Sequence, residues 1–155
     1  MKRKLDNIDR KIISLLQENA RMTLKEIASR IYLSSPAASA RMERLEKEGY
    51  ITGFHASVNR ELMGYHIRAF ITLALHAGLK ETFIREVMQC PNVVECNCIT
   101  GDYALLLEVA YAKMEDLEKF VGGLQKYGKT RTQIVCATAV AHRELLAEQC
   151  VELAG

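Results

Sequence analysis

The 155-residue sequence has no continuous apolar segment of the roughly 20 residues that a membrane-spanning helix needs. The basic residues 2–4 resemble the start of a signal peptide, but residues 5–9 include two aspartates where an apolar segment would have to follow. The sequence therefore predicts neither a signal peptide nor a membrane span, and we expect a cytoplasmic protein.

The cysteines are few and odd in number, five between Cys90 and Cys150. In a chain large enough to bury a core, this argues against a disulfide framework and for a reducing compartment. Cys96 and Cys98 form a lone C-x-C pair without the further ligands of a zinc site. We therefore expect both cysteines to be buried as small hydrophobic side chains. The four histidines show no ligand or nucleophile spacing. We therefore expect no metal site, no cofactor, no catalytic residues and no enzymatic activity.

The composition, 49% hydrophobic and 26% charged, allows one or two small globular domains and argues against disorder. The charge is unevenly distributed. Up to Arg60 there are 12 Lys and Arg against 7 Asp and Glu, a net charge of +5, whereas from Glu61 on there are 9 against 12, a net charge of −3. Such asymmetry is typical of a nucleic-acid-binding module joined to a neutral or acidic domain, because phosphate contacts supply most non-specific affinity for DNA.

Three helices are predicted in the first third of the chain. Asp6 can cap the first helix, in which apolar residues recur at helical spacing. Thr23 and Glu26 have the spacing of a capping box, which begins a second, short helix. Ser34 followed by Pro36 begins a third helix, because a serine cap with a proline in the first turn is a common start signal.

The second and third predicted helices form a helix-turn-helix motif at about residues 24–43. The third helix turns Ala38, Met42 and Leu45 inward, and its other face has small residues near the start and basic residues further along. This order suits a recognition helix, whose N-terminal end lies against base edges while basic side chains reach phosphates. The DNA-binding residues that we predict are Ser34, Ser35, Ser39, Arg41, Arg44 and Lys47. An ordinary helical hairpin with a solvated basic face is the alternative.

Residues 50–58 alternate between polar and apolar side chains and are predicted as a strand that leaves the three helices. Residues 5–66 are therefore expected to form one helix-turn-helix DNA-binding domain with a linker strand.

This region also carries a series of short motifs without gaps between them. They are Leu5-Asp6-x-x-Asp9, Leu16-Gln17, Ala20-Arg21-Met22-Thr23, Glu26-Ile27-Ala28, Leu33-Ser34, Arg41-x-x-Arg44-Leu45-Glu46, Gly49-Tyr50-Ile51 and Met63-Gly64-Tyr65. Together they resemble the Lrp/AsnC, or feast/famine, transcriptional regulators. The family usually has glycine in the turn between the two key helices, where this chain has Tyr32. A tyrosine with a positive φ would be strained, so we expect a differently shaped turn or a packed tyrosine ring.

From His66 on, the sequence pattern changes from helical to alternating. We predict a strand at residues 66–76, a helix at 79–89, strands at 93–100 and 104–111, a helix at 114–127 and a strand at 129–141. This is the ferredoxin-like βαββαβ order, an antiparallel sheet with both helices on one face. The predicted fold class is therefore α+β, with an N-terminal winged-type helix-turn-helix domain followed by a ferredoxin-like α/β sandwich domain at residues 67–155.

One face of the predicted sheet has no helix to cover it. Depending on the register, Leu106 and Ala110, or Cys96 and Cys98, would lie apolar and exposed there, which a soluble monomer rarely tolerates. We therefore expect a partner subunit to cover this face. The resemblance implies the same, because the family's regulator-of-amino-acid-metabolism domain dimerises through its sheet and often assembles into octameric rings. We expect a homodimer that assembles further, into an octamer.

The turn Thr100-Gly101-Asp102-Tyr103 is similar to the family's Gly-Asp-Tyr-Asp loop, near which amino-acid effectors bind between dimers in known members. The resemblance implies that these four residues bind an effector, with Thr138 as a further candidate. The last aspartate of the loop is Ala104 here, which removes one possible anchor for an amino group. The alternative for the loop is a tight connection between two strands that binds no ligand. The alternative for Thr138 is an ordinary threonine of the sheet.

The sequence and the resemblance together predict a sequence-specific DNA-binding transcriptional regulator that responds to an amino acid or a related small metabolite. Its expected partners are double-stranded DNA and that effector, and its expected place in the cytoplasm is with the nucleoid. One alternative is an architectural DNA-wrapping protein without an effector. The other is a tetrapyrrole decarboxylase of the same fold plan, which would carry histidine and arginine motifs that we do not find in this sequence.

Overall fold

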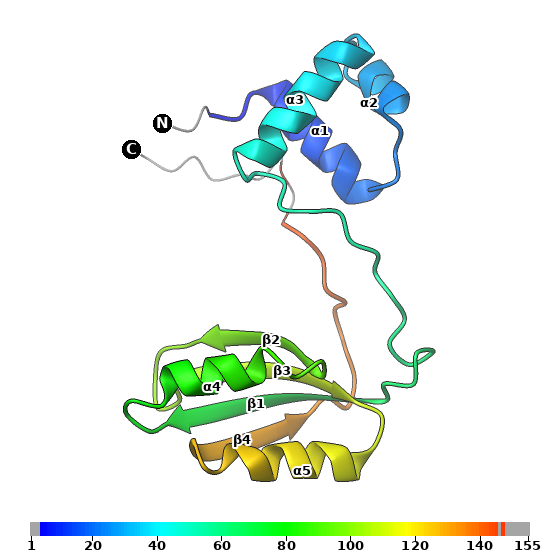
Figure 1. Ribbon diagram of the computed structural model, residues 1–155. Coiled ribbons are helices and arrows are strands. Elements are labelled where there is room, and N and C mark those ends of the chain that lie inside the picture. Colours follow the sequence, from blue (N-terminus) through cyan, green and yellow to red (C-terminus); the bar gives the residue numbers. More distant parts are fainter. Residues whose placement is uncertain (1–3, 146, 148–155) are drawn as a thin grey trace. The chain divides into compact units, whose positions relative to one another are not determined.

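A computed structural model of the chain describes residues 4–145 and 147. These residues form two compact units. The first comprises residues 4–57 together with 141–145 and 147, and the second comprises residues 58–140. The first unit is helical and the second combines a sheet with two helices (Figure 1). In the described part of the chain, no helix is both long enough and apolar enough to cross a membrane.

The first unit is built from α1 at Asn7–Glu18, α2 at Leu24–Arg30 and α3 at Ser35–Lys47. These are the three helices that the sequence predicts. They share an apolar core formed by Ile12, Leu15, Leu16, Ile27, Ala28, Ile31, Ala38 and Leu45. Fully burying a large aliphatic side chain contributes about 1.5–3 kcal/mol, so this core fixes α3 against the other two helices. Ala38 and Leu45 are buried and Met42 packs beside them, as predicted.

Residues 50–58 do not form the predicted strand. Tyr50 and Ile51 donate backbone hydrogen bonds to the Leu45 carbonyl oxygen, at 2.9 and 3.1 Å, and both pack against the helical core. Residues 52–59 are exposed. A strand needs a neighbour whose backbone completes its hydrogen-bond ladder, and the described residues of the first unit contain no strand to provide one. Alternation along the chain was therefore a misleading signal here.

The C-terminal part of the described chain returns to the first unit. The side-chain amide of Gln17 donates a hydrogen bond to the Leu145 carbonyl oxygen at 2.7 Å, and the Ala147 N–H donates to Oε1 of Gln17 at 3.3 Å. Ala147 is buried. The sequence places residues 67–155 in one domain, whereas in the structure residues 141–145 and 147 belong to the first unit.

The second unit contains four strands and two helices in the predicted order. They are β1 at Ile67–Leu75, α4 at Lys80–Val87, β2 at Val93–Cys98, β3 at Leu105–Tyr111, α5 at Met114–Leu124 and β4 at Gly128–Ile134. The prediction is least accurate for β4, which was expected to reach Ala141. Ile134 pairs with Ala69 of β1, and β1 begins only two residues before Ala69, so β4 soon has no partner to continue on.

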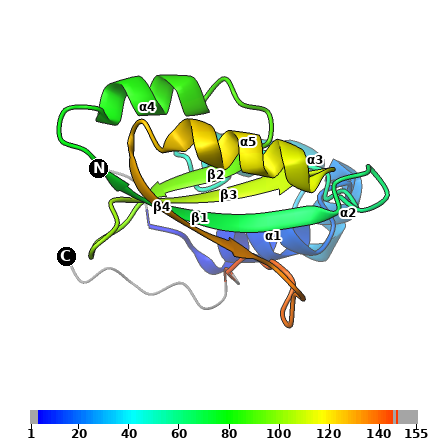
Figure 2. The ribbon, with the colours of Figure 1, turned by 90° about the horizontal axis from the view of Figure 1, so that it is seen from below.

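The sheet is antiparallel, and its strand order β2-β3-β1-β4 is that of the ferredoxin-like fold. Helices α4 and α5 cover the same face of the sheet (Figure 2). The core between the helices and the sheet consists of Ala69, Ile71, Leu73, Phe83, Val87, Leu105, Leu107, Val109, Tyr111, Leu117, Leu124 and Tyr127. The predicted fold class is confirmed.

The register determines which side chains lie on the helix-free face of the sheet. Cys96 pairs with Leu107 and packs against the core, so Leu106, the preceding residue of β3, points to the opposite face. Leu106 is half-buried. The expectation that Ala110 would also be open to water is wrong, because Ala110 is buried within the single chain. Asn92 covers its backbone by donating to the Ala110 carbonyl oxygen at 2.8 Å and accepting from its N–H at 2.9 Å.

The cysteine pair also differs from the expectation of two buried thiols. Cys96 is half-buried against the core, and this burial, followed by the charge of the neighbouring Cys98, raises the pKa of its thiol. Cys98 is exposed, because it is the last residue of the edge strand β2. Only Cys96 therefore behaves as a small hydrophobe.

The helix-free face carries an ion-pair cluster around Glu108. Oε1 of Glu108 accepts hydrogen bonds from Nη1 of Arg60 at 2.7 Å and from Nε of Arg68 at 2.9 Å. The Arg68 guanidinium also lies over the Phe70 ring, 5.3 Å from its centroid. Burial of Glu108 acts to raise the pKa of its carboxyl, but the two arginines hold that pKa below its usual value. This face is therefore more polar than the apolar surface predicted from the sequence.

Candidate DNA interface and effector site

Helix α2 begins at the capping box that the sequence predicts. The Glu26 N–H donates to Oγ1 of Thr23 at 3.3 Å, and the Thr23 N–H donates to Oε2 of Glu26 at 2.7 Å. Two backbone donors that the helix cannot satisfy are thereby paired, so the first residue of α2 is fixed.

Helix α2 ends in a Schellman motif, with a tyrosine at the position that usually holds glycine. The Leu33 N–H donates to the Ala28 carbonyl oxygen at 3.0 Å, and the Tyr32 N–H donates to the Ser29 carbonyl oxygen at 3.4 Å. Tyr32 has a φ of +57°, and no other non-glycine residue among those described has a positive φ. Its side chain is almost free of contacts, since the residue is 94% exposed. Neither expectation for Tyr32 holds, because the turn keeps a left-handed residue and the ring does not pack.

Helix α3 ends in the same motif with the usual residue. The Gly49 N–H donates to the Glu46 carbonyl oxygen at 3.0 Å, the Tyr50 N–H donates to the Leu45 carbonyl oxygen at 2.9 Å, and Gly49 has a φ of +76°. Gly49 is the predicted helix stop. A tyrosine in the left-handed conformation costs about 1–2 kcal/mol, a cost that glycine does not have.

The start of α3 uses the serines that we predicted as DNA ligands. Oγ of Ser34 accepts a hydrogen bond from the Ala37 N–H at 3.4 Å, which makes Ser34 the N-cap, and it is exposed. Ser35 is half-buried. The Ser39 hydroxyl donates to Oε1 of Glu43 at 2.9 Å, one turn further along. Two of the three hydroxyl groups therefore have a partner within their own helix.

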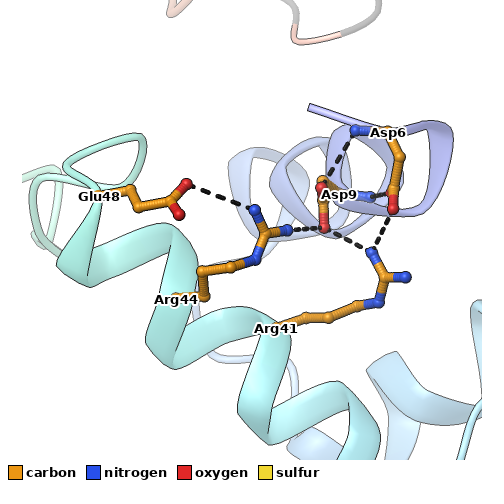
Figure 3. Close-up of polar contacts among 5 residues, drawn as sticks. All are labelled: Asp6, Asp9, Arg41, Arg44 and Glu48. Carbon is orange, nitrogen blue, oxygen red and sulfur yellow. Dashed lines mark hydrogen bonds and ion pairs between the residues drawn. The ribbon is translucent and has the colours of Figure 1, made fainter. Parts of the chain in front are cut away.

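Arg41 and Arg44 of α3 bind to acidic residues at the start of α1 (Figure 3). Nη1 of Arg41 lies 2.6 Å from Oδ2 of Asp6 and 2.8 Å from Oδ1 of Asp9. Nη2 of Arg44 lies 2.6 Å from the same Oδ1 atom, and its Nη1 lies 3.4 Å from Oε2 of Glu48. We call these five residues the α1–α3 ion cluster. It links the recognition helix to the first helix by charge as well as by apolar packing.

The acidic residues of the α1–α3 ion cluster have a second role. Asp6 and Asp9 form a capping box, in which the Asp9 N–H donates to Oδ1 of Asp6 at 2.8 Å and the Asp6 N–H donates to Oδ2 of Asp9 at 3.1 Å. Burial acts to raise the pKa of Asp6, but hydrogen bonds from Arg41 and from the Asp9 backbone hold it below its usual value. The carboxylates in turn raise the pKa of Arg41, and Asp9 raises that of Arg44. Asp6, Arg41 and Arg44 are therefore charged at neutral pH.

The basic residues of α3 that are predicted to contact DNA differ in their exposure to solvent. Lys47 is exposed in the last turn of α3. The side chains of Arg41 and Arg44 are only 27% and 21% exposed, because they lie against α1. Contact between any of these residues and DNA stays a prediction.

The predicted effector loop lies between β2 and β3. Gly101 has a φ of +107°, so the turn needs a glycine there. The Ile99 N–H donates to the Ala104 carbonyl oxygen and the Ala104 N–H donates to the Leu73 carbonyl oxygen, both at 3.0 Å. Residues 100–102 are exposed, and Tyr103 is half-buried.

Thr138 is not close to this loop in the single chain. It lies beyond the end of β4 and is exposed, and its Oγ1 accepts a hydrogen bond from Nη1 of Arg68 at 3.4 Å. The loop is hydrogen-bonded near Leu73, five residues along β1 from Arg68, which is a separation of about 17 Å in a strand. The two parts of the predicted effector site therefore lie toward opposite ends of β1. Among residues 4–145 and 147, no group of three or more His, Cys, Asp or Glu could hold a metal ion.

Two family models match the chain, one in each half. Residues 5–52 match the winged helix-turn-helix DNA-binding model, and residues 68–145 match the Lrp/AsnC ligand binding domain. The chain belongs to the Lrp/AsnC family of transcriptional regulators.

Relatives cover most of this Lrp/AsnC regulator. The HTH-type transcriptional regulator FL11 of Pyrococcus furiosus is 35% identical over 134 residues, which cover 84% of this chain and 89% of that protein. The structure of B. subtilis LrpC has a TM-score of 0.85 at 25% identity, covering 90% of this chain and 100% of that one. A transcriptional regulator from Neisseria meningitidis, solved as an L-Met complex, has a TM-score of 0.83 at 28% identity. The match covers 90% of this chain and 94% of that one. The chain thus combines a DNA-binding domain with a small-molecule-binding domain, as a ligand-responsive transcriptional regulator does.

The carboxylates of the α1–α3 ion cluster are not among the site residues predicted from the sequence. Asp6 and Asp9 are three residues apart on one helix, and Arg41 and Arg44 are three residues apart on another. Residues three apart lie on one face of a helix, so two such pairs of opposite charge can meet when those faces pack together. The sequence predicts the two arginines only as phosphate ligands.

Proposed function

We propose that this Lrp/AsnC regulator binds duplex DNA through the exposed side of α3 and that a small molecule of the amino-acid class controls this binding. The observation that carries the DNA part is the α1–α3 ion cluster. It holds α3 by Arg41 and Arg44, while Ser34 at the start of the helix and Lys47 at its end stay exposed. A rigidly held helix with an open N-terminal end suits insertion into the major groove.

In this proposal, Ser34, Ser35 and Ser39 face base edges and Lys47 faces a phosphate. Arg41 and Arg44 have more donors than their carboxylate partners use, because a guanidinium carries five N–H groups. They can therefore contact DNA phosphates from the rim of the interface while they remain bound to α1. Phosphate contacts of this kind set the position of the helix on the duplex.

We further propose that the regulator works as a homodimer that assembles into an octamer. The helix-free face of the sheet, with Leu106 and Phe70 beside the Glu108 ion pairs, is the surface that supports a dimer. Two-fold pairing would place two copies of α3 for successive major grooves, about 34–36 Å apart or a multiple of that distance.

The effector part of the proposal rests on the ligand binding domain and on the relative solved with L-Met. In this chain the loop Thr100-Gly101-Asp102-Tyr103 and Thr138 are the proposed ligand residues. Since they lie toward opposite ends of β1, one chain does not bring them into a single pocket. We propose that a ligand reaches both only between subunits. The proteins that match this chain are named as regulators, so we propose regulation at the nucleoid rather than catalysis.

The test is a DNA-retardation titration with the twenty amino acids, one at a time, on a fragment selected by the protein. We expect one or a few amino acids to change the apparent Kd, and the Asp102→Ala variant to lose that response while its affinity for DNA without effector stays the same. DNA binding that no amino acid changes would instead support an architectural DNA-wrapping protein, a reading that the missing carboxylate at Ala104 favours. The absence of DNA binding would contradict the whole proposal.

A further inference from the structure

We propose that Tyr32 contacts the DNA backbone, with its hydroxyl group donating a hydrogen bond to a phosphate oxygen. This inference rests on the proposed binding of DNA by α3 and extends the interface to the turn before that helix. It concerns a residue that lies outside both α2 and α3 and outside the set of DNA ligands named above.

The first observation is backbone strain that the fold does not require. Tyr32 adopts a φ of +57° within a Schellman motif, and Gly49 occupies the same position of the same motif at the end of α3. A glycine at position 32 could form the same two backbone hydrogen bonds without strain. Strained residues persist mainly at functional sites, where the function of the side chain outweighs the cost of the strained backbone.

The second observation is that the tyrosine ring contributes nothing to the packing of the first unit. Tyr32 is 94% exposed, whereas the next residue, Leu33, packs against the helical core. A large aromatic side chain that is left in water while its half-buried neighbour packs against the core is available to a partner. Its hydroxyl can donate a hydrogen bond while its ring covers apolar surface.

The third observation is the position of the turn. Tyr32 is two residues before Ser34, the N-cap of α3, and two residues after Arg30, the exposed basic residue in the last turn of α2. In helix-turn-helix proteins the recognition helix enters the groove by its N-terminal end, while the preceding helix crosses the sugar-phosphate backbone. The turn between them therefore faces a phosphate and its sugar. A phenol matches both, through its hydroxyl group and its ring.

The experiment compares the full-length wild type with Tyr32→Gly and Tyr32→Phe. Thermal unfolding and sedimentation velocity are measured together with the Kd for selected and random duplexes at several salt concentrations. Tyr32→Gly relieves the strain and removes the side chain. Tyr32→Phe keeps the backbone and the ring but removes the hydroxyl group. Met88→Ala, which truncates an exposed apolar side chain in the second unit, is the control.

We expect Tyr32→Gly to raise the Tm by about 1–5 °C and to weaken DNA binding about 3- to 10-fold. Tyr32→Phe should keep the wild-type Tm and lose most of the same affinity. The loss should be equal on selected and random DNA, because phosphate contacts carry no sequence information. The salt dependence should not change, since a neutral hydroxyl group displaces no counterion. If Tyr32→Gly stabilises the protein but weakens DNA binding, the tyrosine side chain serves DNA binding and not folding.

Several results would overturn the inference. Wild-type affinity in both Tyr32 variants would show that the turn does not touch DNA, and wild-type affinity in Tyr32→Phe alone would exclude the hydroxyl contact. A lower Tm in Tyr32→Gly would show that the side chain serves folding. A changed sedimentation coefficient would place Tyr32 in a contact between copies of the chain. In each case the wild type still binds DNA, whereas failure of the proposed function would appear as no binding by any of the four proteins.

Discussion

Oδ1 of Asp9 lies 2.6 Å from Nη2 of Arg44, and the Asp9 side chain is completely buried between α1 and α3. The same oxygen also binds Arg41 at 2.8 Å. One carboxylate atom on the first helix therefore orients two basic residues of the recognition helix. The geometry of the proposed DNA-binding surface therefore depends on a residue that is itself completely buried.

Replacing Asp9 by Asn tests this dependence. The amide removes the negative charge that the two half-buried guanidinium groups share, and leaves Arg41 with Asp6 and Arg44 with Glu48 as their remaining acidic partners. Removing one partner of a buried pair typically costs about 3–5 kcal/mol, and we expect roughly 2–3 kcal/mol here because both arginines retain some access to water. Urea unfolding measures the change in the free energy of unfolding. Asp116→Asn, which removes the exposed partner of Lys119, is the control and should cost less than about 0.5 kcal/mol. Equal effects of the two substitutions would contradict the structural role of Asp9.

Replacing Lys47 or Arg44 by Ala tests the proposed phosphate contacts. Each contact that is lost should lower the slope of log K against log salt concentration by about one unit, on selected and random DNA alike. Fluorescence anisotropy at several salt concentrations measures this slope, with Lys119→Ala as the control. We expect Arg44→Ala to lower the stability as well, since it also removes the bond to Asp9. An unchanged salt slope would assign Arg44 to positioning α3 only.

Replacing Leu106 by Glu tests the helix-free face of the sheet as an interface between subunits. A carboxylate at this position would be buried in the interface without a partner, so we expect the assembly to dissociate into smaller species. Sedimentation velocity measures the outcome. The control is Met88→Glu, which places the same charge on an exposed residue at the end of α4. A wild type that sediments as a folded monomer at micromolar concentration would contradict the interface itself.

Replacing Glu108 by Gln tests the ion pairs with Arg60 and Arg68 through their pH dependence. The folded-state pKa of Glu108 lies below its ordinary value of 4.5, so the unfolded state binds more protons as the pH falls. The stability that Glu108 supplies is therefore complete above about pH 4.5 and is lost as the pH falls through the folded-state pKa. We expect the free energy of unfolding of the wild type to exceed that of the variant by about 1–2 kcal/mol at pH 7. This difference should shrink below about pH 4.5. A constant difference from pH 7 to pH 3 in urea unfolding would contradict this.

The elements that the sequence predicted well are those with local signals. Thr23 with Glu26, and Ser34 with Pro36, fix the starts of α2 and α3 within a few residues of chain, so no distant contact is needed to locate them. The order of strands and helices from Ile67 on follows in the same way from a change in hydrophobic periodicity.

The elements that the sequence did not predict depend on distant partners. Residues 50–58 alternate like a strand but have no neighbouring strand among the residues that the structure describes, and β4 ends where β1 has no further residues to pair with it. The pairing of Asp9 with Arg44 and the return of Leu145 to Gln17 join residues that are far apart in the sequence. Which of many complementary charges or amides meet is decided by tertiary packing, and a single sequence does not record it.

The bonds between Gln17 and the residues near the C-terminus also bear on the order in which the protein is made. They join positions 128 and 130 residues apart, and the intervening chain includes the entire second unit. A ribosome that has just completed α3 has therefore not yet synthesised all the residues that complete the first unit. Domains generally fold as units during synthesis, and contacts this distant in sequence form late. The first three helices are thus translated before the second unit, but the contacts of Gln17 can form only after it, so a chain terminated before Leu145 would lack these contacts with α1.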